Sequence, residues 1–501
     1  MGHRAAKAPR TFWVGILGVA FAALLLAAGC MKVGPDYKPP KEKVPPSWQQ
    51  AKDPALPRSQ SNLTQWWEVF NDPQLTSLIQ RAGQGNLDLK AAVSRVKQAR
   101  AQLGVITGEL YPQVDLNADA TRQQASKKSL SNVTQQGITG EQFEIGAGAS
   151  WEIDLFGRIR RSVEAARADL QASQEDRADV MVSLYSQVAQ TYLTVRTLQT
   201  RIAATQENIQ SQIGVLKLTQ ARFKWGLATD LDVSQAETVL GSSRAQLPPL
   251  RNSLTQAYST LALLLGLPPN ALRAELEKPK TIPDPPVRVA VGVPADLLRQ
   301  RPDIRRAERQ LAAATARIGV ATADLYPRLT LLGSLGTVSS NLSDLFGAGT
   351  LNYSFGPSFS WNIFAGGSIR SQIKVQDALT EQALLTYESA VLGALKEVED
   401  ALDAFTQEKV RQKALRSTVV SSRRSLELAL RLYKEGLQDF QPVLDAQRNL
   451  FDYDNELASS RGQVATNLVN IYQALGGGWD PAKAADTPQK PQTKATAANK
   501  P

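Results

Sequence analysis

The residue types that most often carry enzymatic or metal chemistry are almost missing from this chain. Among its 501 residues there is one histidine, His3, and one cysteine, Cys30. A single thiol cannot close an internal disulfide, and one His and one Cys cannot make a thiolate or imidazole metal site. The chain after Cys30 also lacks histidine, the commonest general base. These observations argue against most classes of enzyme and against a resident metal.

Two other patterns in the sequence resemble catalytic or ligand-binding sites. Four acidic residues cluster in the second half of the chain: Glu397, Glu399, Asp400 and Asp403. Their spacing is most simply that of a solvated helix face. Residues 476–478 are three glycines, but no Lys-Ser or Lys-Thr follows them, so a phosphate-binding loop is not supported. We therefore expect a protein that is not an enzyme and holds no cofactor.

Cys30 instead predicts a covalent modification. Residues 1–29 have a basic start and an apolar stretch, and they end in Leu26-Ala-Ala-Gly29 directly before the cysteine. This is typical of a secretory signal, and the small residues before Cys30 resemble a bacterial lipobox. Cys30 would then carry diacylglycerol and a fatty acyl chain such as palmitate. Met31 is not the aspartate associated with inner-membrane retention, which favours the outer membrane. The alternative is an ordinary cleavage site with an incidental thiol.

The positive charge of the chain is concentrated at its ends. The net charge is +10, and basic residues lie in the leader and in the Ala-, Lys-, Pro- and Thr-rich tail 481–501. The body between them is only weakly basic, so binding to nucleic acid is not indicated. The composition of the tail predicts disorder.

The chain contains two proline-free runs of equal length, residues 158–224 and 368–434. These runs must position the strands and the turns between them. As continuous helices each would be about 100 Å long, at about 1.5 Å per residue. The second run has a heptad-like apolar seam, typical of helices packed lengthwise: Leu384, Val391, Leu395, Val398, Leu402 and Phe405. Both runs end in a Gly-Leu pair, Gly226-Leu227 and Gly436-Leu437, where glycine stops the helix and the chain reverses. The runs therefore predict two very long helical hairpins.

The body of the chain is an internal duplication. Leu110-Tyr111-Pro112 returns as Leu325-Tyr326-Pro327, and from Trp151 and Trp361 onward the matches keep a constant offset of 210 residues. Each half is expected to contain a helix, a strand pair, the long helix, a tip and a return helix. The expected divisions are signal 1–29, extended strap 30–75, first repeat 76–270, linker 271–290, second repeat 291–480 and tail 481–501.

The strand pairs, 113–123 with 141–153 and 328–338 with 351–363, alternate between apolar and polar residues. Examples are Val114, Leu116 and Ala118 on one face of the first strand, and Asp115 and Asn117 on the other. Strands of about ten residues with an aromatic-flanked apolar face fit a membrane barrel. One chain supplies four strands, whereas closed outer-membrane barrels start at about eight. Because open edges cannot lie in lipid, several chains must share one barrel.

At this point a family resemblance is close. Val33-Gly34-Pro35-Asp36-Tyr37, the duplicated body, the Gly-Leu tips, Val443-Leu-Asp-Ala-Gln447 and Ala474-Leu-Gly-Gly-Gly-Trp479 resemble the TolC-like outer-membrane efflux proteins. The likeness is to their lipoprotein branch, OprM-like or NodT-like, which serves multidrug pumps of the RND class. It implies an α+β membrane protein: a homotrimer with a twelve-stranded outer-membrane β-barrel, a twelve-helix periplasmic α-barrel and a mixed equatorial region. The implied function is passive conduction from an inner-membrane pump to the exterior.

The resemblance also implies site residues. Gly226, Leu227, Gly436 and Leu437 would dock a periplasmic adaptor (membrane fusion protein), the alternative being simple helix caps. Asp445 would line the periplasmic constriction as a ring of three carboxylates, the alternative being a surface pair with Arg448. Gln441 stands one turn earlier, where close relatives carry leucine, so its part in that constriction stays open.

Two other functions remain as alternatives. One is an exit channel for ABC-driven type I protein secretion, and the other is a lipid-anchored structural coiled-coil protein without a pore. The lipobox and Val33–Tyr37 favour efflux over the first, and the alternating strands and the duplication disfavour the second.

Overall fold

The computed structural model describes residues 32–41, 44–48, 63–124, 139–284 and 294–480. The expected signal peptide, Cys30 and the tail lie outside these residues. The described chain forms two compact units. The first contains the strap up to Lys41 with Val96–Ser173 and Ala307–Tyr387, and the second contains most of the remaining helical residues.

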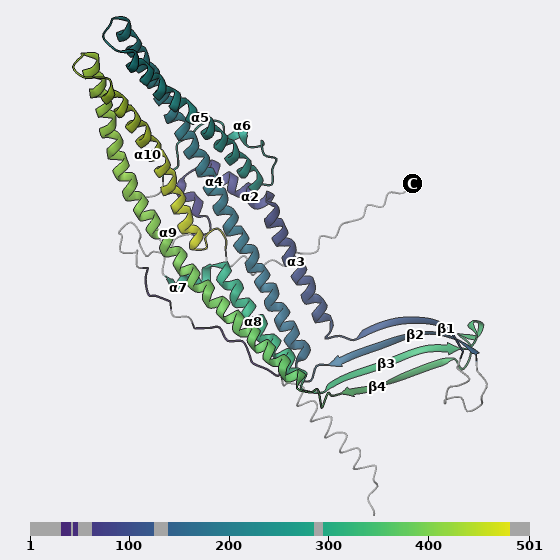
Figure 1. The fold of residues 1–501 in the computed structure, drawn as a ribbon. Helices are drawn as coiled ribbons and strands as arrows, with labels where there is room; N and C mark the ends of the chain where they lie inside the picture. Colours follow the sequence, from purple (N-terminus) through teal and green to yellow (C-terminus); the bar gives the residue numbers. More distant parts are fainter. Residues whose placement is uncertain (1–31, 42–43, 49–62, 125–138, 285–293, 481–501) are drawn as a thin grey trace, which may run out of the picture. The chain divides into compact units, whose positions relative to one another are not determined.

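The first unit contains one antiparallel sheet of four strands in the order β1-β2-β3-β4 (Figure 1). The strands are β1 (Gln113–Gln124), β2 (Thr139–Ile153), β3 (Arg328–Ser339) and β4 (Leu351–Ser360). β4 was expected to continue to residue 363, but it ends at Ser360. The reason is that Ser360 pairs with Arg328, the first residue of β3, so the next residues have no strand partner.

The register places the apolar positions of all four strands on one face. Ala147 of β2 pairs with Leu116 of β1 and with Leu335 of β3, and Leu335 pairs with Tyr353 of β4. This face is open in the single chain, with Leu116 76% exposed and Tyr353 65% exposed. Within the described residues, β1 and β4 each have a neighbour on one side only. The sheet therefore has an apolar face and two edges that one chain does not cover.

The duplicated Leu-Tyr-Pro and Trp motifs make the same contact in each half. The indole N–H of Trp151, near the end of β2, donates to the carbonyl of Leu110 at 2.9 Å. The indole N–H of Trp361, just after β4, donates to the carbonyl of Leu325 at 3.1 Å. In each half the tryptophan thus ties the end of a strand pair to the turn that precedes it.

The helices are α2 (Pro73–Gly85), α3 (Leu87–Gly108), α4 (Arg158–Lys224), α5 (Asp230–Leu264), α6 (Arg273–Leu276), α7 (Pro294–Gln300), α8 (Pro302–Ala323), α9 (Ser368–Lys434) and α10 (Gln441–Ala474). A 3₁₀ helix, η1 (Trp66–Phe70), precedes them. α4 and α9 have the bounds of the two proline-free runs, and each has 67 residues. No helix in the described ranges is both long enough and apolar enough to cross a membrane.

Each half begins with two helices instead of the expected one. In the first half the break is at Asn86, whose side chain accepts from the Leu89 N–H at 2.8 Å and so starts a new helix. In the second half the break is at Arg301, because a residue before proline is disfavoured in the helical conformation. Asn86 and Pro302 are recognisable signals that the simpler expectation overlooked.

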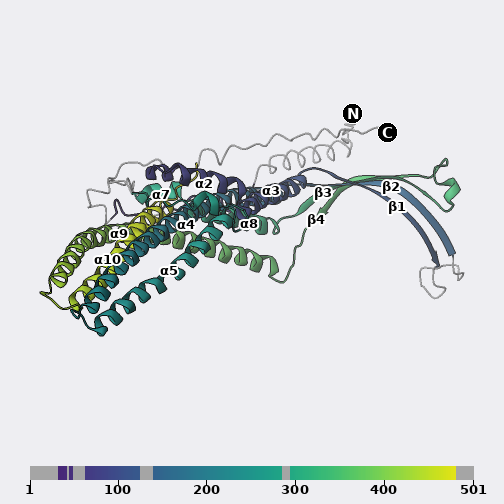
Figure 2. The ribbon, with the colours of Figure 1, turned by 90° about the horizontal axis from the view of Figure 1, so that it is seen from above.

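The second unit is held together by apolar seams along the long helices. Of the expected seam on α9, Val391, Val398, Leu402 and Phe405 are at most 4% exposed. The C-terminal part of α9 lies beside α10 in both views (Figures 1 and 2). Val215 of α4, Val239 of α5, Leu426 of α9 and Val443 of α10 belong to one buried cluster. This cluster joins the ends of all four helices.

The two adjacent tryptophans of η1 are interior residues. Trp66 is fully buried and its ring stacks on Tyr472 with centroids 5.4 Å apart. Trp67 meets Tyr185 edge to face at 5.3 Å. They anchor η1 against the helical unit.

Candidate functional site

The first hairpin tip is built by a glycine-terminated helix end. Gly226 has φ of +72°, a conformation that favours glycine. The Leu227 N–H donates to the Arg222 carbonyl and the Gly226 N–H to the Phe223 carbonyl, both at 2.9 Å. These two bonds define a Schellman motif, which satisfies the last carbonyls of α4 and reverses the chain. Thr229 then caps α5.

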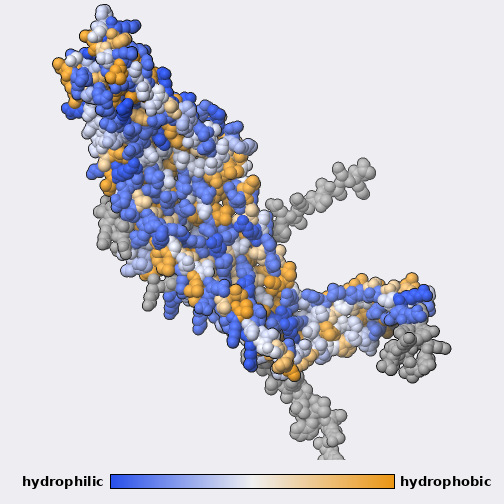
Figure 3. Space-filling model, viewed as in Figure 1, coloured by the Kyte–Doolittle hydropathy of each residue, from blue (hydrophilic) through white to orange (hydrophobic). Residues whose placement is uncertain are grey.

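The second tip repeats this geometry. Gly436 also has φ of +72°, and the Leu437 and Gly436 N–H groups donate to the Leu432 and Tyr433 carbonyls at 3.0 and 3.1 Å. The leucine side chains of both tips face solvent: Leu227 is 63% and Leu437 71% exposed. Apolar side chains are visible among polar ones at the helical tips (Figure 3). Both glycines therefore cap helices, and both leucines remain available for contact.

The two tips are not equivalent in their other side chains. The first exposes Phe223 and Trp225, at 45% and 81%. The positions that correspond in the second tip are Tyr433, which is 3% exposed, and the charged residue Glu435. The first tip thus has a larger exposed apolar surface. Trp225 was not predicted as a site residue from the sequence, although its place beside the glycine of the tip was a signal.

A contact that the sequence did not indicate joins the two tips. Arg222, near the end of α4, donates to the carbonyl of Lys434, the last residue of α9, at 3.0 Å. The same guanidinium donates to the Leu227 carbonyl at 3.3 Å and lies 4.6 Å from the centroid of the Tyr433 ring. The Tyr433 ring is 5.1 Å from that of Phe440, which directly precedes α10.

Asp445 lies on the exposed side of the first turns of α10. Its neighbours Val443 and Leu444 are buried, whereas the carboxylate accepts a hydrogen bond from the Gln441 amide at 3.1 Å. Among the described residues, the ion pairs do not include one between Asp445 and Arg448. The surface pair considered from the sequence is therefore not formed. Gln441 and Asp445 instead form one polar group, four residues apart on the same face.

The acidic residues of α9 have ordinary structural partners. Glu397 pairs with Arg301 at 2.7 Å, and Asp400 pairs with Lys396 one turn away. Arg301, 8% exposed, also donates to the Ala474 carbonyl at 2.8 Å and so ties the start of α8 to the end of α10. Burial by itself would raise the pKa of Asp303, but hydrogen bonds and charge from Arg301 outweigh burial and lower the pKa. This network is structural, and Arg301-Pro302-Asp303 was not singled out from the sequence.

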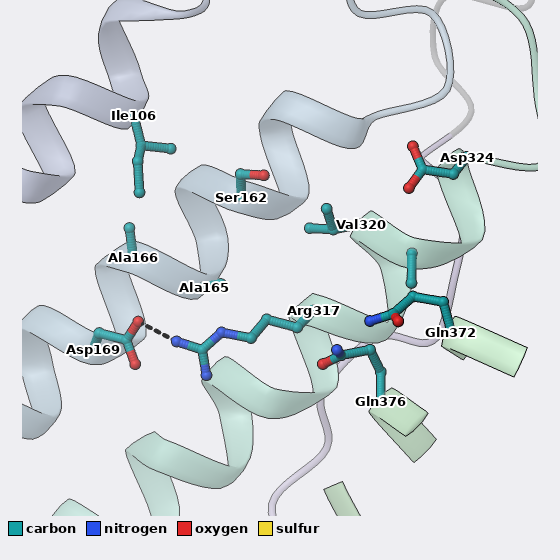
Figure 4. Close-up of a pocket in the computed structure, with 11 residues that line it drawn as sticks. Ile106, Ser162, Ala165, Ala166, Asp169, Arg317, Val320, Asp324, Gln372 and Gln376 are labelled. Atoms are coloured by element: carbon teal, nitrogen blue, oxygen red, sulfur yellow. Dashed lines mark hydrogen bonds and ion pairs between the residues drawn. The ribbon is translucent and has the colours of Figure 1, made fainter. Parts of the chain in front are cut away.

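A cavity of about 320 Å³ opens between α3, α4, α8 and α9 in the first unit (Figure 4). Its walls combine small side chains, including Ala165 and Ala166, with polar and charged ones, and Arg317 reaches Asp169 at 2.6 Å across it. The second carboxylate of the lining, Asp324, is paired with Arg328 at 2.6 Å. Since both acids are neutralised by arginines, the cavity presents no free carboxylate pair for acid–base catalysis.

The strap is seated on the first unit by a buried arginine. Arg161, 1% exposed, donates to the carbonyls of Val33 at 3.0 Å and Gly34 at 2.8 Å. Gly34 has φ of +84°, and a Cβ there would lie 2.4 Å from the Cα of Gly319. The Tyr37 hydroxyl donates to Glu308 at 3.0 Å. The Val33–Tyr37 motif is therefore a docking segment, and it begins three residues after Cys30.

Comparisons with known proteins agree with this architecture. Residues 78–267 and 293–477 match the family of outer membrane efflux proteins. Nodulation protein T of Rhizobium leguminosarum bv. trifolii is 32% identical over 463 residues, 92% of this chain and 97% of that protein. The probable efflux pump outer membrane protein TtgC of Pseudomonas putida is 32% identical over 470 residues, 93% and 96% of the two chains.

The structural comparison supports the same conclusion. The outer-membrane channel OprN superimposes with a TM-score of 0.84 at 34% identity, over 89% of this chain and 99% of that chain. The α+β fold and the family resemblance expected from the sequence are therefore confirmed.

Proposed function

The chain belongs to the outer membrane efflux protein family, and we propose that it is the exit duct of a tripartite efflux system driven by an RND-type pump. In this role it conducts drugs or other small molecules passively from a periplasmic pump assembly to the exterior. It performs no chemical step, and the pump supplies the energy and selects the substrates.

The observation that carries the proposal is the four-stranded sheet with an exposed apolar face and two unpaired edges. A lipid-facing sheet with open edges is not stable, because unpaired backbone groups cost several kcal/mol each in hydrocarbon. Three copies would close a ring of twelve strands, which is wide enough to leave a channel. The α4/α5 and α9/α10 hairpins of three copies would line a twelve-helix tunnel. We therefore propose a homotrimer in the outer membrane.

We propose that Cys30 carries the lipid anchor of each copy. The docking of Val33–Tyr37 supports this role, because the hydrogen bonds from the buried Arg161 hold the chain a few residues beyond Cys30. The acyl chains would add membrane affinity of about 0.8 kcal/mol per buried CH₂ group.

The tips supply the two remaining parts of the mechanism. Leu227 and Leu437, exposed beside Gly226 and Gly436, would contact a periplasmic adaptor, with Leu227 in the larger apolar surface. Asp445, hydrogen-bonded to Gln441, would form a ring of three carboxylates in the trimer. Such a ring favours cations over anions and narrows the closed entrance. Adaptor binding would move the helices outward and widen it.

The test is a photo-crosslinking residue at position 227 in living cells, with one at Ser253, exposed on the same helical hairpin, as the control. Capture of an RND-type adaptor at 227 but not at 253 is the expected result. Capture of an ABC-type adaptor would move the assignment to type I protein secretion. If position 227 captures only its own chain, and the purified protein gives no conductance in planar bilayers, the exit-duct proposal is wrong.

A further inference from the structure

We infer that the tail of this chain binds in a cavity of its own helical unit, with Pro488-Gln-Lys-Pro491 against the aromatic walls and Asp486 paired with Arg177. The family match ends at residue 477, so membership of the family assigns no role to the tail 481–501. The inference does not depend on the function proposed above.

The cavity lies within the second unit and has a volume of about 350 Å³. Segments far apart in the chain supply its three aromatic rings: Trp67 of η1, Tyr185 of α4 and Trp479, which follows α10. Met181 of α4 adds an apolar side chain, and an arginine and several glutamine amides complete the lining. Rings combined with a few polar groups, at this volume, are the features of a ligand-binding site.

Two polar groups of the lining have no partner in the described part of the chain. Trp67 is only 5% exposed, and its indole N–H has no acceptor there. Arg177 of α4 forms none of the ion pairs found there, and its neighbours Glu175 and Asp176 pair with other arginines. A buried donor without an acceptor is unfavourable. The ligand that fits this cavity therefore has a hydrogen-bond acceptor beside the rings and a negative charge near Arg177.

The tail contains both of these features in one short segment. Pro488 and Pro491 have the spacing of the Pro-x-x-Pro segments that bind aromatic-lined grooves in the polyproline II conformation. This conformation has no internal hydrogen bonds, so its carbonyl groups are available to a donor such as the Trp67 indole. Asp486 is the one acidic residue of the tail, and it stands two residues before Pro488.

The tail also begins at the cavity. Asp480, the last residue that the structure describes, belongs to the lining. Eight further residues lead to Pro488, and an extended chain of that length reaches about 27 Å. The two prolines are only about 9 Å apart in polyproline II, at about 3.1 Å per residue. A linker this short gives an effective concentration in roughly the millimolar range, which favours the chain's own tail over a separate partner.

The experiment places a photo-crosslinking residue at position 80 of the full-length protein in living cells. Gln80 is exposed on α2 and lines the cavity. Gln84 is exposed on the same helix but does not line the cavity, so it gives the control position. Position 80 should capture residues 481–501, in a product that keeps the mass of a single chain and is identified by mass spectrometry. Position 84 should give only background capture of the tail.

Substitutions in the tail leave the helical unit unchanged and test the two contacts separately. Pro488→Ala combined with Pro491→Ala should reduce capture at position 80 to the background of position 84. Asp486→Asn should reduce capture roughly threefold, because a partly exposed ion pair contributes modestly. Arg177→Asp should also reduce capture, and combining it with Asp486→Arg should restore capture.

Equal capture of the tail at both positions, or capture at position 80 that does not depend on the two prolines, would overturn the inference. A product of higher mass would also overturn it, because a second copy or another protein would then occupy the cavity. If Arg177→Asp yields no folded protein, the proline pair and Asp486→Asn still decide, since both changes lie outside the helical unit.

Discussion

Replacement of Arg161 by alanine should release the strap from the first unit. The guanidinium is buried and makes charged hydrogen bonds to the carbonyls of Val33 and Gly34. It also pairs with Glu164 at 2.9 Å, and with Asp36 at 3.0 Å. Arg161→Ala would remove all four interactions and leave two strap carbonyls without their donor.

The magnitude follows from the two carbonyl bonds. Hydrogen bonds that involve a charged group contribute about 1.5–3 kcal/mol each. The Asp36 side chain is 73% exposed, so its pairing is screened by water and adds nothing to the sum. A loss of about 3–6 kcal/mol for the two bonds would lower the docking equilibrium of the strap by roughly two to four orders of magnitude.

Hydrogen exchange followed by mass spectrometry reads this change directly. The Val33 N–H donates to the Phe156 carbonyl at 3.2 Å, so its exchange reports strap docking. Exchange over residues 32–41 should accelerate by roughly a hundredfold or more in Arg161→Ala. Arg167→Ala, an exposed arginine on the same helix, should exchange as the wild type. Unchanged protection in Arg161→Ala would refute the reasoning and leave the packing of Gly34 and Tyr37 as the main attachment.

Three further outcomes are expected. Burial raises the pKa of Asp454, so Asp454→Asn should raise the Tm by about 1–2 °C at pH 7. The Tm difference between variant and wild type should vanish below pH 3.8, the ordinary pKa, because the wild-type carboxyl is then protonated in both the folded and the unfolded state. The pKa of Asp303 is lowered, so its ionised carboxylate stabilises the fold above pH 3.8, and this stabilisation is lost as the pH falls through the lowered pKa. Asp303→Asn should therefore flatten the acid limb of a Tm-against-pH curve. A Cβ at Gly336 would lie 2.7 Å from the Ile145 carbonyl oxygen, whereas one at Gly333 would meet nothing within 4 Å. Gly336→Val should therefore prevent insertion of the protein into the membrane, which is measured as loss of the heat-modifiable band on gels. Gly333→Val should leave that band unchanged.

Much of the architecture was predictable because it depends on local patterns. The bounds of α4 and α9 follow from proline-free runs that end at glycine, and the faces of the strands follow from alternation with a period of two. The duplication also predicted the positions of the two tips in the chain. The starts of α3 and α8 were missed although Asn86 and Pro302 mark them, because a single helix was assumed for each half.

The place of Trp66 and Trp67 shows where local patterns stop. An aromatic pair after a proline-rich strap is compatible with an interior anchor and with a membrane headgroup region. Only the packing of the two rings against Tyr472 and Tyr185 shows that the pair lies in the interior. The choice depends on which distant rings are nearby, and residue type alone does not encode that.

The sequence by itself determined the repeat, the long helices, the alternating strands and the family. The tertiary structure alone decided that Arg161 seats the strap, that Arg301 joins α8 to α10 and that Arg222 joins the two tips. Arg222 and its acceptor Lys434 are 212 residues apart. Each of these arginines binds main-chain carbonyl oxygens, and every residue has such a group. A side chain that recognises backbone therefore has no partner motif in the sequence, and it is identified only when folding brings the two segments together.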